Sequence, residues 1–370
     1  MAQTILTPEN DYARLDEWLR EQGVRRPMVV CDGAFPRLSV AGHIRQLEER
    51  GLSAVYFTGF EPNPRYESAT AGVRLFREKE CDAVLAVGGG SAMDVGKCVK
   101  LWARLEDGTP YYRQKPAPNG IPLLAMPTTA GTGAEATQFA VIYADGEKIS
   151  VSHPEALPGT VLMDPGVLAT LPLYQRKATM LDALCHAVES CWSVSSTEES
   201  RALAADAIRA VLAAKDGYLA NRPEENAAML RAAHLAGQAI NLTRTTAGHA
   251  MCYKLTTLYG LAHGHAAALC VNALFPWMLA HPERVCDPRG AEQVRAAMVQ
   301  IAAAMGCGTP EEAAAGFAAA LRALDLPKPA VKAGDYEILK RSVNAERLGN
   351  HPCALDEETI DVLYHQILEG

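Results

Sequence analysis

The segment 81–97, CDAVLAVGGGSAMDVGK, constrains the fold more than any other part of the chain. An apolar run typical of a buried strand ends in three glycines, and a helix-like segment follows. Glycines let backbone amides approach a phosphate closely, and a helix N-terminus adds partial positive charge. The segment therefore predicts a pyrophosphate-binding turn. An ordinary glycine turn remains the simpler alternative, because the run lacks the GxGxxG fingerprint.

Up to about residue 175, short apolar runs alternate with amphipathic helical windows, which predicts a parallel sheet covered on both faces. The expected strands are Pro27–Cys31, Ala54–Phe57, Ala83–Val87 and Ile121–Met126, and the expected helices are Ser39–Arg50 and Arg65–Lys79. The proline-rich stretch 152–171 is expected to be an irregular crossover.

Beyond about residue 178 the sequence becomes rich in alanine and leucine at helical spacing, as in Glu199–Ala214 and Glu224–Ala239. A chain of 370 residues with 49% hydrophobic residues can bury two cores. We therefore predict an α/β nucleotide-binding domain over residues 1–177 and an all-α domain over residues 178–370.

The charge and the cysteines limit the classes of partner. A formal net charge of -8 gives no general footprint for nucleic acid or anionic membranes. The ten cysteines include no CxxC pair, which favours reduced thiols in a cytoplasmic protein. The N-terminal residues lack the layout of a signal peptide, and no unbroken apolar run is long enough to span a bilayer.

Two further features point to the crevice at the end of the predicted sheet. The loop MPTTAGTGAE at 126–135 follows an expected strand, and its hydroxyls and glycines can line the site where open α/β sheets bind ligands. Asp32 ends the first expected strand, where a carboxylate can bond ribose hydroxyls but would repel a 2′-phosphate. The position of Asp32 therefore favours NAD over NADP.

The second half holds a candidate metal site. Asp182 and His186 are four residues apart in a helical window, so both side chains lie on one face. Alone, they could be no more than a hydrogen-bonded pair. Apolar surroundings also hold His249, His263 and His265. One carboxylate and three imidazoles suit Fe²⁺ or Zn²⁺, whereas calcium and magnesium need more oxygen ligands.

Four motifs, GGGSAMDVGK, PTTAGTGAE, LDALCHAVES and AGH…AHGH, resemble those of the group III iron-containing alcohol dehydrogenases. The resemblance covers nearly the whole chain, in order. It implies a Rossmann-like domain, a helical domain, and a cleft that holds NAD(H) and one metal ion. Relatives of this family are often dimers or larger, so a homo-oligomer, most simply a dimer, is expected.

The resemblance also implies roles for individual residues. The metal ligands fall on Asp182, His186, His249 and His263, which leaves His265 as a neighbour. The positions implied for cofactor binding are Gly88, Gly89, Gly90, Ser91, Asp94, Lys97, Thr128, Thr129, Thr132 and Lys148, in addition to Asp32.

The chain departs from the family pattern at three places. The usual serine before the loop glutamate is Ala134, and the usual glycine before the helix motif is Met180 or Leu181. A frequent active-site histidine, offered as a proton relay in relatives, is Tyr253 here. Proton delivery would then fall to Tyr253 or to water.

The stretch 241–264 resembles a subgroup that reduces phosphonoacetaldehyde or the isosteric sulfoacetaldehyde. Such a substrate needs a cation for its anionic head, and Arg244, Lys254 and Arg347 are the candidates, unless they are only surface charges. The expected reaction is NADH-dependent reduction of sulfoacetaldehyde to isethionate, with the metal as Lewis acid. Phosphonoacetaldehyde or a neutral alcohol is the next alternative, followed by a lyase of the dehydroquinate synthase type and by a non-catalytic metal-binding protein.

Overall fold

The structure, a computed structural model, describes residues 3–332, 334–343 and 348–369. The chain divides into two compact units, which we call the α/β unit and the helical unit. The α/β unit comprises residues 1–129 and 133–171, and the helical unit comprises residues 130–132 and 172–370. The first helix of the helical unit begins at Leu173, before the expected domain boundary at residue 178.

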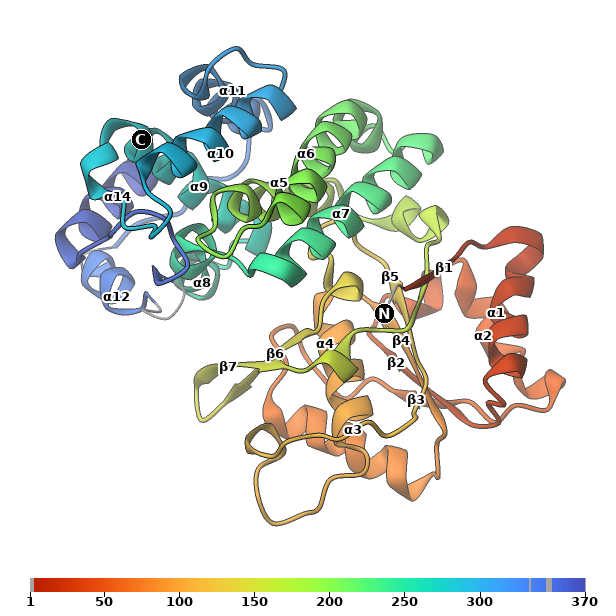
Figure 1. The fold of residues 1–370 in the computed structure, drawn as a ribbon. Helices are drawn as coiled ribbons and strands as arrows, with labels where there is room; N and C mark the ends of the chain where they lie inside the picture. Colours follow the sequence, from red (N-terminus) through yellow and green to blue (C-terminus); the bar gives the residue numbers. More distant parts are fainter. Residues whose placement is uncertain (1–2, 333, 344–347, 370) are drawn as a thin grey trace. The chain divides into compact units, whose positions relative to one another are not determined.

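The described part of the α/β unit contains a parallel sheet of six strands in the order β1-β8-β5-β4-β2-β3 (Figure 1). The strands are β1 Thr4–Leu6, β2 Pro27–Cys31, β3 Val55–Phe57, β4 Ala83–Gly88, β5 Leu123–Pro127 and β8 Thr160–Leu162. Every residue of β2, β4 and β5 is buried, as expected for central parallel strands covered on both faces. The predicted fold class is confirmed.

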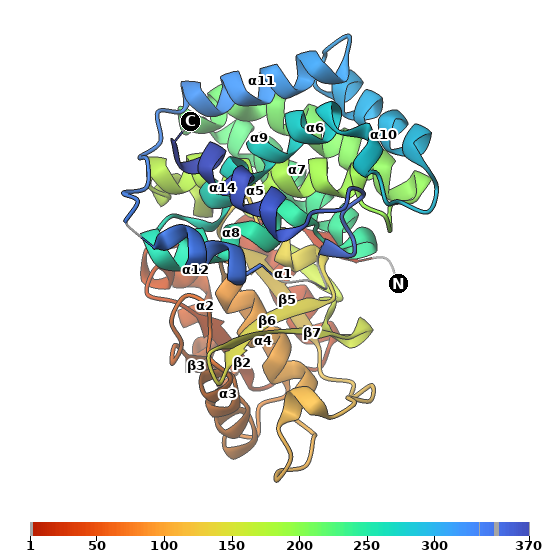
Figure 2. The same ribbon diagram turned by 90° about the vertical axis from the view of Figure 1, so that its left-hand side faces the viewer.

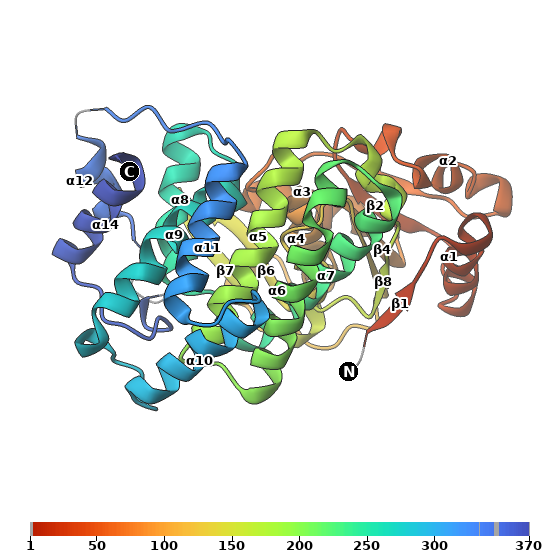
Figure 3. The ribbon, with the colours of Figure 1, turned by 90° about the horizontal axis from the view of Figure 1, so that it is seen from above.

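Four helices flank the sheet, α1 and α2 on one face and α3 and α4 on the other (Figure 3). They are α1 Glu9–Glu21, α2 Val40–Arg45, α3 Tyr66–Glu78 and α4 Gly90–Trp102. Alternate strand residues, such as Val30 and Ala86, join Val73 and Val99 in one core beneath α3 and α4. The period of two along each strand therefore divides the apolar side chains between two layers of helices.

The four predicted strands are confirmed to within two residues. The helix predicted over residues 39–50 is wrong in its length, because α2 ends at Arg45 and a separate 3₁₀ turn forms over Glu48–Arg50. The stretch 152–171, expected to be irregular, contains β8, which lies between β1 and β5. Three residues are too short to show a strand period in the sequence.

A two-stranded antiparallel hairpin, β6 Phe139–Ala144 and β7 Glu147–Ser152, was also missed. Its turn is Asp145-Gly146, with φ of 53° and 82°. Both values are positive, which is the conformation that an Asp-Gly hairpin turn favours. This dipeptide between two alternating runs was the available signal in the sequence.

The described part of the helical unit contains no strand of the sheet, as predicted. Its helices are α5 Leu173–Trp192, α6 Glu198–Leu219, α7 Pro223–Thr243, α8 Ala247–Tyr259, α9 His263–Ala280, α10 Ala291–Ala304, α11 Pro310–Ala323, α12 Asp335–Arg341 and α14 Glu357–Glu369. The expected helices at 199–214 and 224–239 are confirmed as the central parts of α6 and α7. A reciprocal capping box of Thr197 and Ser200 fixes the start of α6.

Helix α5 forms the centre of the helical unit. It packs against α6 and α7 on one side and against α9 on the other (Figures 1 and 3). Helices α11 and α14 both pack on α9 (Figure 2). Almost every residue of α5 from Ala178 onward is buried, so a polar side chain on this helix must find its partners inside the unit. No described helix is both long enough and apolar enough to cross a membrane.

We predict that Gly96→Ala lowers the stability of the α/β unit. A Cβ at Gly96, inside α4, would lie 2.7 Å from the Cβ of Ala86 on β4, so the helix would have to move away from the sheet. Overpacking of this kind costs about 1–3 kcal/mol. The matched control is Gly42→Ala, inside α2, where a Cβ meets nothing within 4 Å. Thermal unfolding followed by circular dichroism should show a lower Tm for Gly96→Ala and an equal or higher Tm for the control; equal Tm values would contradict the prediction.

Candidate metal and nucleotide sites

One face of α5 carries three buried polar side chains, Asp182, His186 and Glu189. Their spacing of four and then three residues places them above one another along the helix. Asp182 and His186 are 2% and 5% exposed, and Glu189 is fully buried. Groups of this kind are rarely buried unless they are paired with each other or with a ligand.

The ring of His249, from the first turn of α8, lies between the two carboxylates of α5. Its Nε2 is 3.4 Å from Oδ1 of Asp182, and its Nδ1 is hydrogen bonded to Oε2 of Glu189. His263 is the first residue of α9. One ligand atom from each of Asp182, His249 and His263 lies within 4.8 Å of the other two. The structure therefore brings three of the four predicted metal ligands together.

His186 lies beside this group of three. Its ring is stacked on that of His249, with centroids 4.5 Å apart and an interplanar angle of 13°. His265 is placed differently, because its Nδ1 is 3.2 Å from the hydroxyl of Tyr174. His265 is buried and does not belong to the group of three.

Electrostatics in the cluster favour a positive charge at its centre. Burial raises the pKa of Asp182, but His186, His249 and His263 outweigh it and hold that pKa well below its usual range. Burial lowers the pKa of His249, whereas Glu189 and Asp182 raise it, with a net rise to about 9. Burial is the dominant effect on His186 and lowers its pKa to about 4.

Three buried polar atoms of these side chains suit a divalent transition metal. Within the described part of the chain, Oδ1 of Asp182, Nδ1 of His186 and Nε2 of His249 are buried without a hydrogen-bond partner. Buried polar atoms are nearly always satisfied, so three neighbouring exceptions indicate a ligand. One carboxylate oxygen with imidazole nitrogens is a donor set for Fe²⁺ or Zn²⁺ and does not suit Ca²⁺ or Mg²⁺.

Sequence reasoning missed Glu189, which contacts both the ring and the backbone of His249. A histidine that binds a metal commonly gives its second ring N–H to a carboxylate. The signal was present in the sequence, because Glu189 follows His186 by three residues and so shares its helix face.

The residues predicted to act on the substrate are placed as follows. Tyr253 stacks on His263, with centroids 5.5 Å apart at 14°. Lys254 is half-buried on α8, and Arg244 is exposed between α7 and α8. Arg347 lies outside the described residues.

In the α/β unit, the carboxyl ends of β2, β4 and β5 meet at the predicted nucleotide site. The backbone of Thr128 donates to the carbonyl of Gly88 at 3.0 Å, and a Cβ on Gly89 would touch the side chain of Thr129. A Cβ on Gly88 would lie 3.5 Å from Oδ2 of Asp32. The structure therefore brings the glycine turn, the start of the loop 126–135 and the carboxylate of Asp32 together at one edge of the sheet.

This edge is also the topological switch point of the sheet. From β2 the chain passes to β3 on one side, and then to β4 on the other side of β2. Ligands of doubly wound sheets bind where the strand order reverses in this way. Gly90 and Ser91 begin α4 at that point, so the amides of its first turn lie at the carboxyl edge of the sheet.

The remaining predicted cofactor residues lie elsewhere. Lys97 is buried and uses its ammonium to bond the carbonyls of Ala134 and Phe139, each at 2.6 Å, and the hydroxyl of Thr137 at 3.0 Å. Lys97 thus holds the end of the loop 126–135 in place.

Asp94, from the same helix as Lys97, is directed at the β6–β7 hairpin. Burial raises its pKa, which is opposed by Lys97, by a hydrogen bond from the backbone of Val141 and by Lys148. Thr132 belongs to the helical unit, where the adjacent Gly131 lies against Thr179 of α5.

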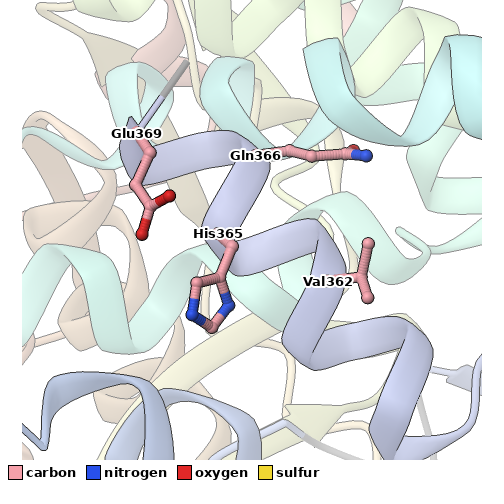
Figure 4. Close-up of a pocket in the computed structure, with 4 residues that line it drawn as sticks. All are labelled: Val362, His365, Gln366 and Glu369. Atoms are coloured by element: carbon pink, nitrogen blue, oxygen red, sulfur yellow. The ribbon is translucent and has the colours of Figure 1, made fainter.

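A shallow depression on α14 is lined by Val362, His365, Gln366 and Glu369 (Figure 4). The ring of His365 is stacked on Tyr336, with centroids 3.7 Å apart. The depression shares no residue with the metal cluster.

A doubly wound nucleotide-type sheet, joined to a helical unit with a buried cluster suited to a transition metal, defines the class of protein. Residues 2–165 match the iron-containing alcohol dehydrogenase family, and residues 177–366 match its C-terminal family. The chain therefore belongs to the iron-containing alcohol dehydrogenases and is an alcohol dehydrogenase or aldehyde reductase of that family.

Individual relatives differ in substrate. The chain is 35% identical to a phosphonoacetaldehyde reductase of Streptomyces viridochromogenes over 80% of its own length and 78% of the relative. It is 32% identical to a 1,3-propanediol dehydrogenase of Citrobacter freundii, over 72% and 69%. The crystal structure of sulfoacetaldehyde reductase from Bifidobacterium kashiwanohense in complex with NAD⁺ has the same fold, with a TM-score of 0.86 at 24% identity over 99% and 97% of the two chains.

We predict that Gly264→Ala weakens metal binding although it removes no ligand. A Cβ there would lie 2.0 Å from the carbonyl oxygen of Ala178 and 2.5 Å from the Cβ of Asp182, so α9 would have to move away from α5. His263 would move with it, and we expect metal affinity to fall at least about tenfold, as for other changes that displace a ligand.

The control for this prediction is Gly316→Ala, inside α11 of the same unit, where a Cβ makes only ordinary contacts at 3.8 Å. Zn²⁺ affinity, measured by competition with a chromophoric chelator, should fall for Gly264→Ala and stay unchanged for the control. Unchanged affinity in both variants would show that the approach of α9 to α5 does not set the site.

Proposed function

We propose that this protein is an NADH-dependent reductase of a small anionic aldehyde, with sulfoacetaldehyde, reduced to isethionate, as the preferred substrate. The observation that carries the proposal is the group of Asp182 and His249, both buried, with the half-buried His263, in a member of the iron-containing alcohol dehydrogenase family. The likeness to a phosphonoacetaldehyde reductase supports an anionic substrate.

In this proposal Asp182, His186, His249 and His263 hold the metal, with Fe²⁺ as the expected ion and Zn²⁺ as the alternative. The ion supplies Lewis acidity for the carbonyl oxygen when it is bound. The loop 88–91, with Thr128 and Thr129, holds the pyrophosphate of NADH, and Asp32 bonds a ribose hydroxyl. In this way the protein would bind and orient both the cofactor and the aldehyde.

Arg244 is the strongest candidate for binding the anionic head. Its φ of 60° and ψ of 176° fall in a backbone region that is essentially restricted to glycine. Hydrogen bonds hold this conformation. The amide of Arg244 donates to the carbonyl of Ile240 at 2.7 Å, and the hydroxyl of Thr243 donates to the carbonyl of Arg244 at 3.0 Å. A cationic side chain kept on such a backbone, next to the helix of His249, supports a functional role.

Tyr253 is proposed as the proton donor to the developing alkoxide. Its stacking on His263 places a phenol at the metal cluster, where the family more often has a histidine. Lys254, the next residue on α8, is a second candidate cation for the substrate.

The finer choice of substrate rests on head-group charge and size. Phosphonoacetaldehyde is the first alternative because of the 35% identical relative, and a neutral alcohol is the second because of the 1,3-propanediol dehydrogenase. We further propose a homo-oligomer, most simply a dimer, and a cytoplasmic location. The ten free cysteines support the location, since a reducing compartment keeps thiols free.

The deciding experiment follows NADH oxidation by absorbance on Fe²⁺-loaded protein with sulfoacetaldehyde, phosphonoacetaldehyde and propanal in parallel. Selective turnover of sulfoacetaldehyde is the expected result. Selective turnover of phosphonoacetaldehyde would reassign the head group, and turnover of propanal alone would leave a general alcohol dehydrogenase. Absence of NADH oxidation with all three would overturn the proposal and favour a lyase.

We predict that Arg244→Ala raises KM for the anionic aldehyde by about 10- to 100-fold, the usual range for losing a charge-assisted hydrogen bond. KM for propanal should change little, because propanal has no anionic head. Arg209→Ala is the control, since Arg209 pairs with Asp206 on the exposed side of α6. Equal effects of Arg244→Ala on both substrates would contradict the role of Arg244 in head-group binding.

A further inference from the structure

Both carboxylate oxygens of Glu189 are engaged. Oε1 accepts hydrogen bonds from the amide of Thr246 at 3.0 Å, from its hydroxyl at 2.5 Å and, more weakly, from the amide of His249 at 3.4 Å. Oε2 bonds Nδ1 of His249. A single side chain of α5 therefore contacts both the backbone and the ring of a residue on α8.

Through Oε1, Glu189 acts as the N-cap of a helix to which it does not belong. Thr246 precedes α8, but its own side chain makes no capping bond to the helix. The first amides of a helix need an acceptor, and a negative charge there interacts favourably with the helix dipole. Glu189 provides both and so fixes where α8 begins relative to α5.

Glycine at position 248 makes this close approach possible. A Cβ there would lie 3.0 Å from Oε1 of Glu189 and 2.7 Å from Cγ2 of Val271. Any larger residue would move α8 away from the carboxylate. The contact is thus built into the packing of three helices, α5, α8 and α9.

Through Oε2, Glu189 determines which nitrogen of His249 is free. A histidine binds a metal in its neutral form. Because a carboxylate accepts and cannot donate, Nδ1 of the neutral His249 ring must carry the hydrogen, and the lone pair is left on Nε2. Nε2 is the atom that faces Oδ1 of Asp182. Glu189 and Asp182 together also carry the two negative charges that balance a divalent cation.

We infer that Glu189 is a positioning residue of the metal site: it selects the His249 tautomer with Nε2 free and fixes the ring by capping α8. This inference rests on the proposed metal role of Asp182, His249 and His263. Glu189 is not a ligand in this arrangement, because both of its oxygens are already engaged by α8.

The first test is Glu189→Gln, which keeps the shape and an oxygen for the helix cap. Its amide nitrogen would donate to Nδ1 of His249, which moves the ring hydrogen to Nε2 and removes the lone pair from the metal side. We expect the dissociation constant for Zn²⁺, from chelator competition, to rise about 10- to 100-fold, as for other partners of metal-binding histidines.

The matched control is Asp287→Asn, another buried carboxylate of the helical unit, which pairs with Arg289. We expect it to lower Tm and to leave the Zn²⁺ dissociation constant within about threefold of the parent, below the range of a lost partner of a ligand. Zn²⁺ binding by Glu189→Gln that equals the parent would overturn the inference. Failure of the parent protein itself to bind Zn²⁺ would instead overturn the proposed metal site.

A second measurement needs no variant and so holds even if Glu189→Gln does not fold. In the Zn²⁺-loaded parent protein labelled with ¹⁵N-histidine, two-bond ¹H–¹⁵N correlations report the tautomer of each ring. We expect His249 to carry its hydrogen on Nδ1. A hydrogen on Nε2, or a ring that exchanges between tautomers, would show that Glu189 does not set the tautomer.

Discussion

The helical unit depends on two carboxylates buried on one face of α5. A buried carboxylate without partners is very unfavourable; here Asp182 lies against the ring of His249, and Glu189 is hydrogen bonded to that ring and to the start of α8. Partners that come from α8 and α9 must be held close to α5 to serve in this way. The polar cluster therefore determines which helices pack together, while the surrounding apolar residues supply most of the stabilisation.

The polar groups of the cluster divide into those that hold the helices together and those that are available to a ligand. Glu189 has both oxygens engaged within the protein, whereas Oδ1 of Asp182 and Nε2 of His249 have no hydrogen-bond partner among the described residues. The oxygens of Glu189 fix the position of α8, whereas the atoms of Asp182 and His249 are left for a ligand. In a site of this form, hydrogen bonds to residues behind the ligands hold the unpartnered ligand atoms in place.

Spacing indicated part of this arrangement, and the resemblance to the iron-containing alcohol dehydrogenases supplied the set of metal ligands. Asp182 and His186 at i and i+4 indicated one helix face, and the glycine run after a strand indicated the nucleotide turn. Spacing puts Glu189 on the helix face of His186, but it could not reveal what Glu189 binds, because its partners, Thr246 and His249, are 57 and 60 residues away. The strand β8 was missed for a related reason: three residues have no period, and only their pairing with β1 and β5 makes them a strand.

The packing of α8 and α9 on α5 explains why a glycine stands next to each of two histidines. His249 follows Gly248, where a Cβ would press on Glu189, and His263 precedes Gly264, where a Cβ would collide with Asp182. Each histidine thus stands beside a glycine that lets its helix reach a carboxylate of α5. A glycine next to a histidine, repeated in a second helix, therefore indicates convergence on one point more strongly than either histidine does alone. Where Gly264 lies against the Cβ of Asp182, the short side chain of Asp182 suffices to bring a carboxylate oxygen to within 4.8 Å of His249 and His263.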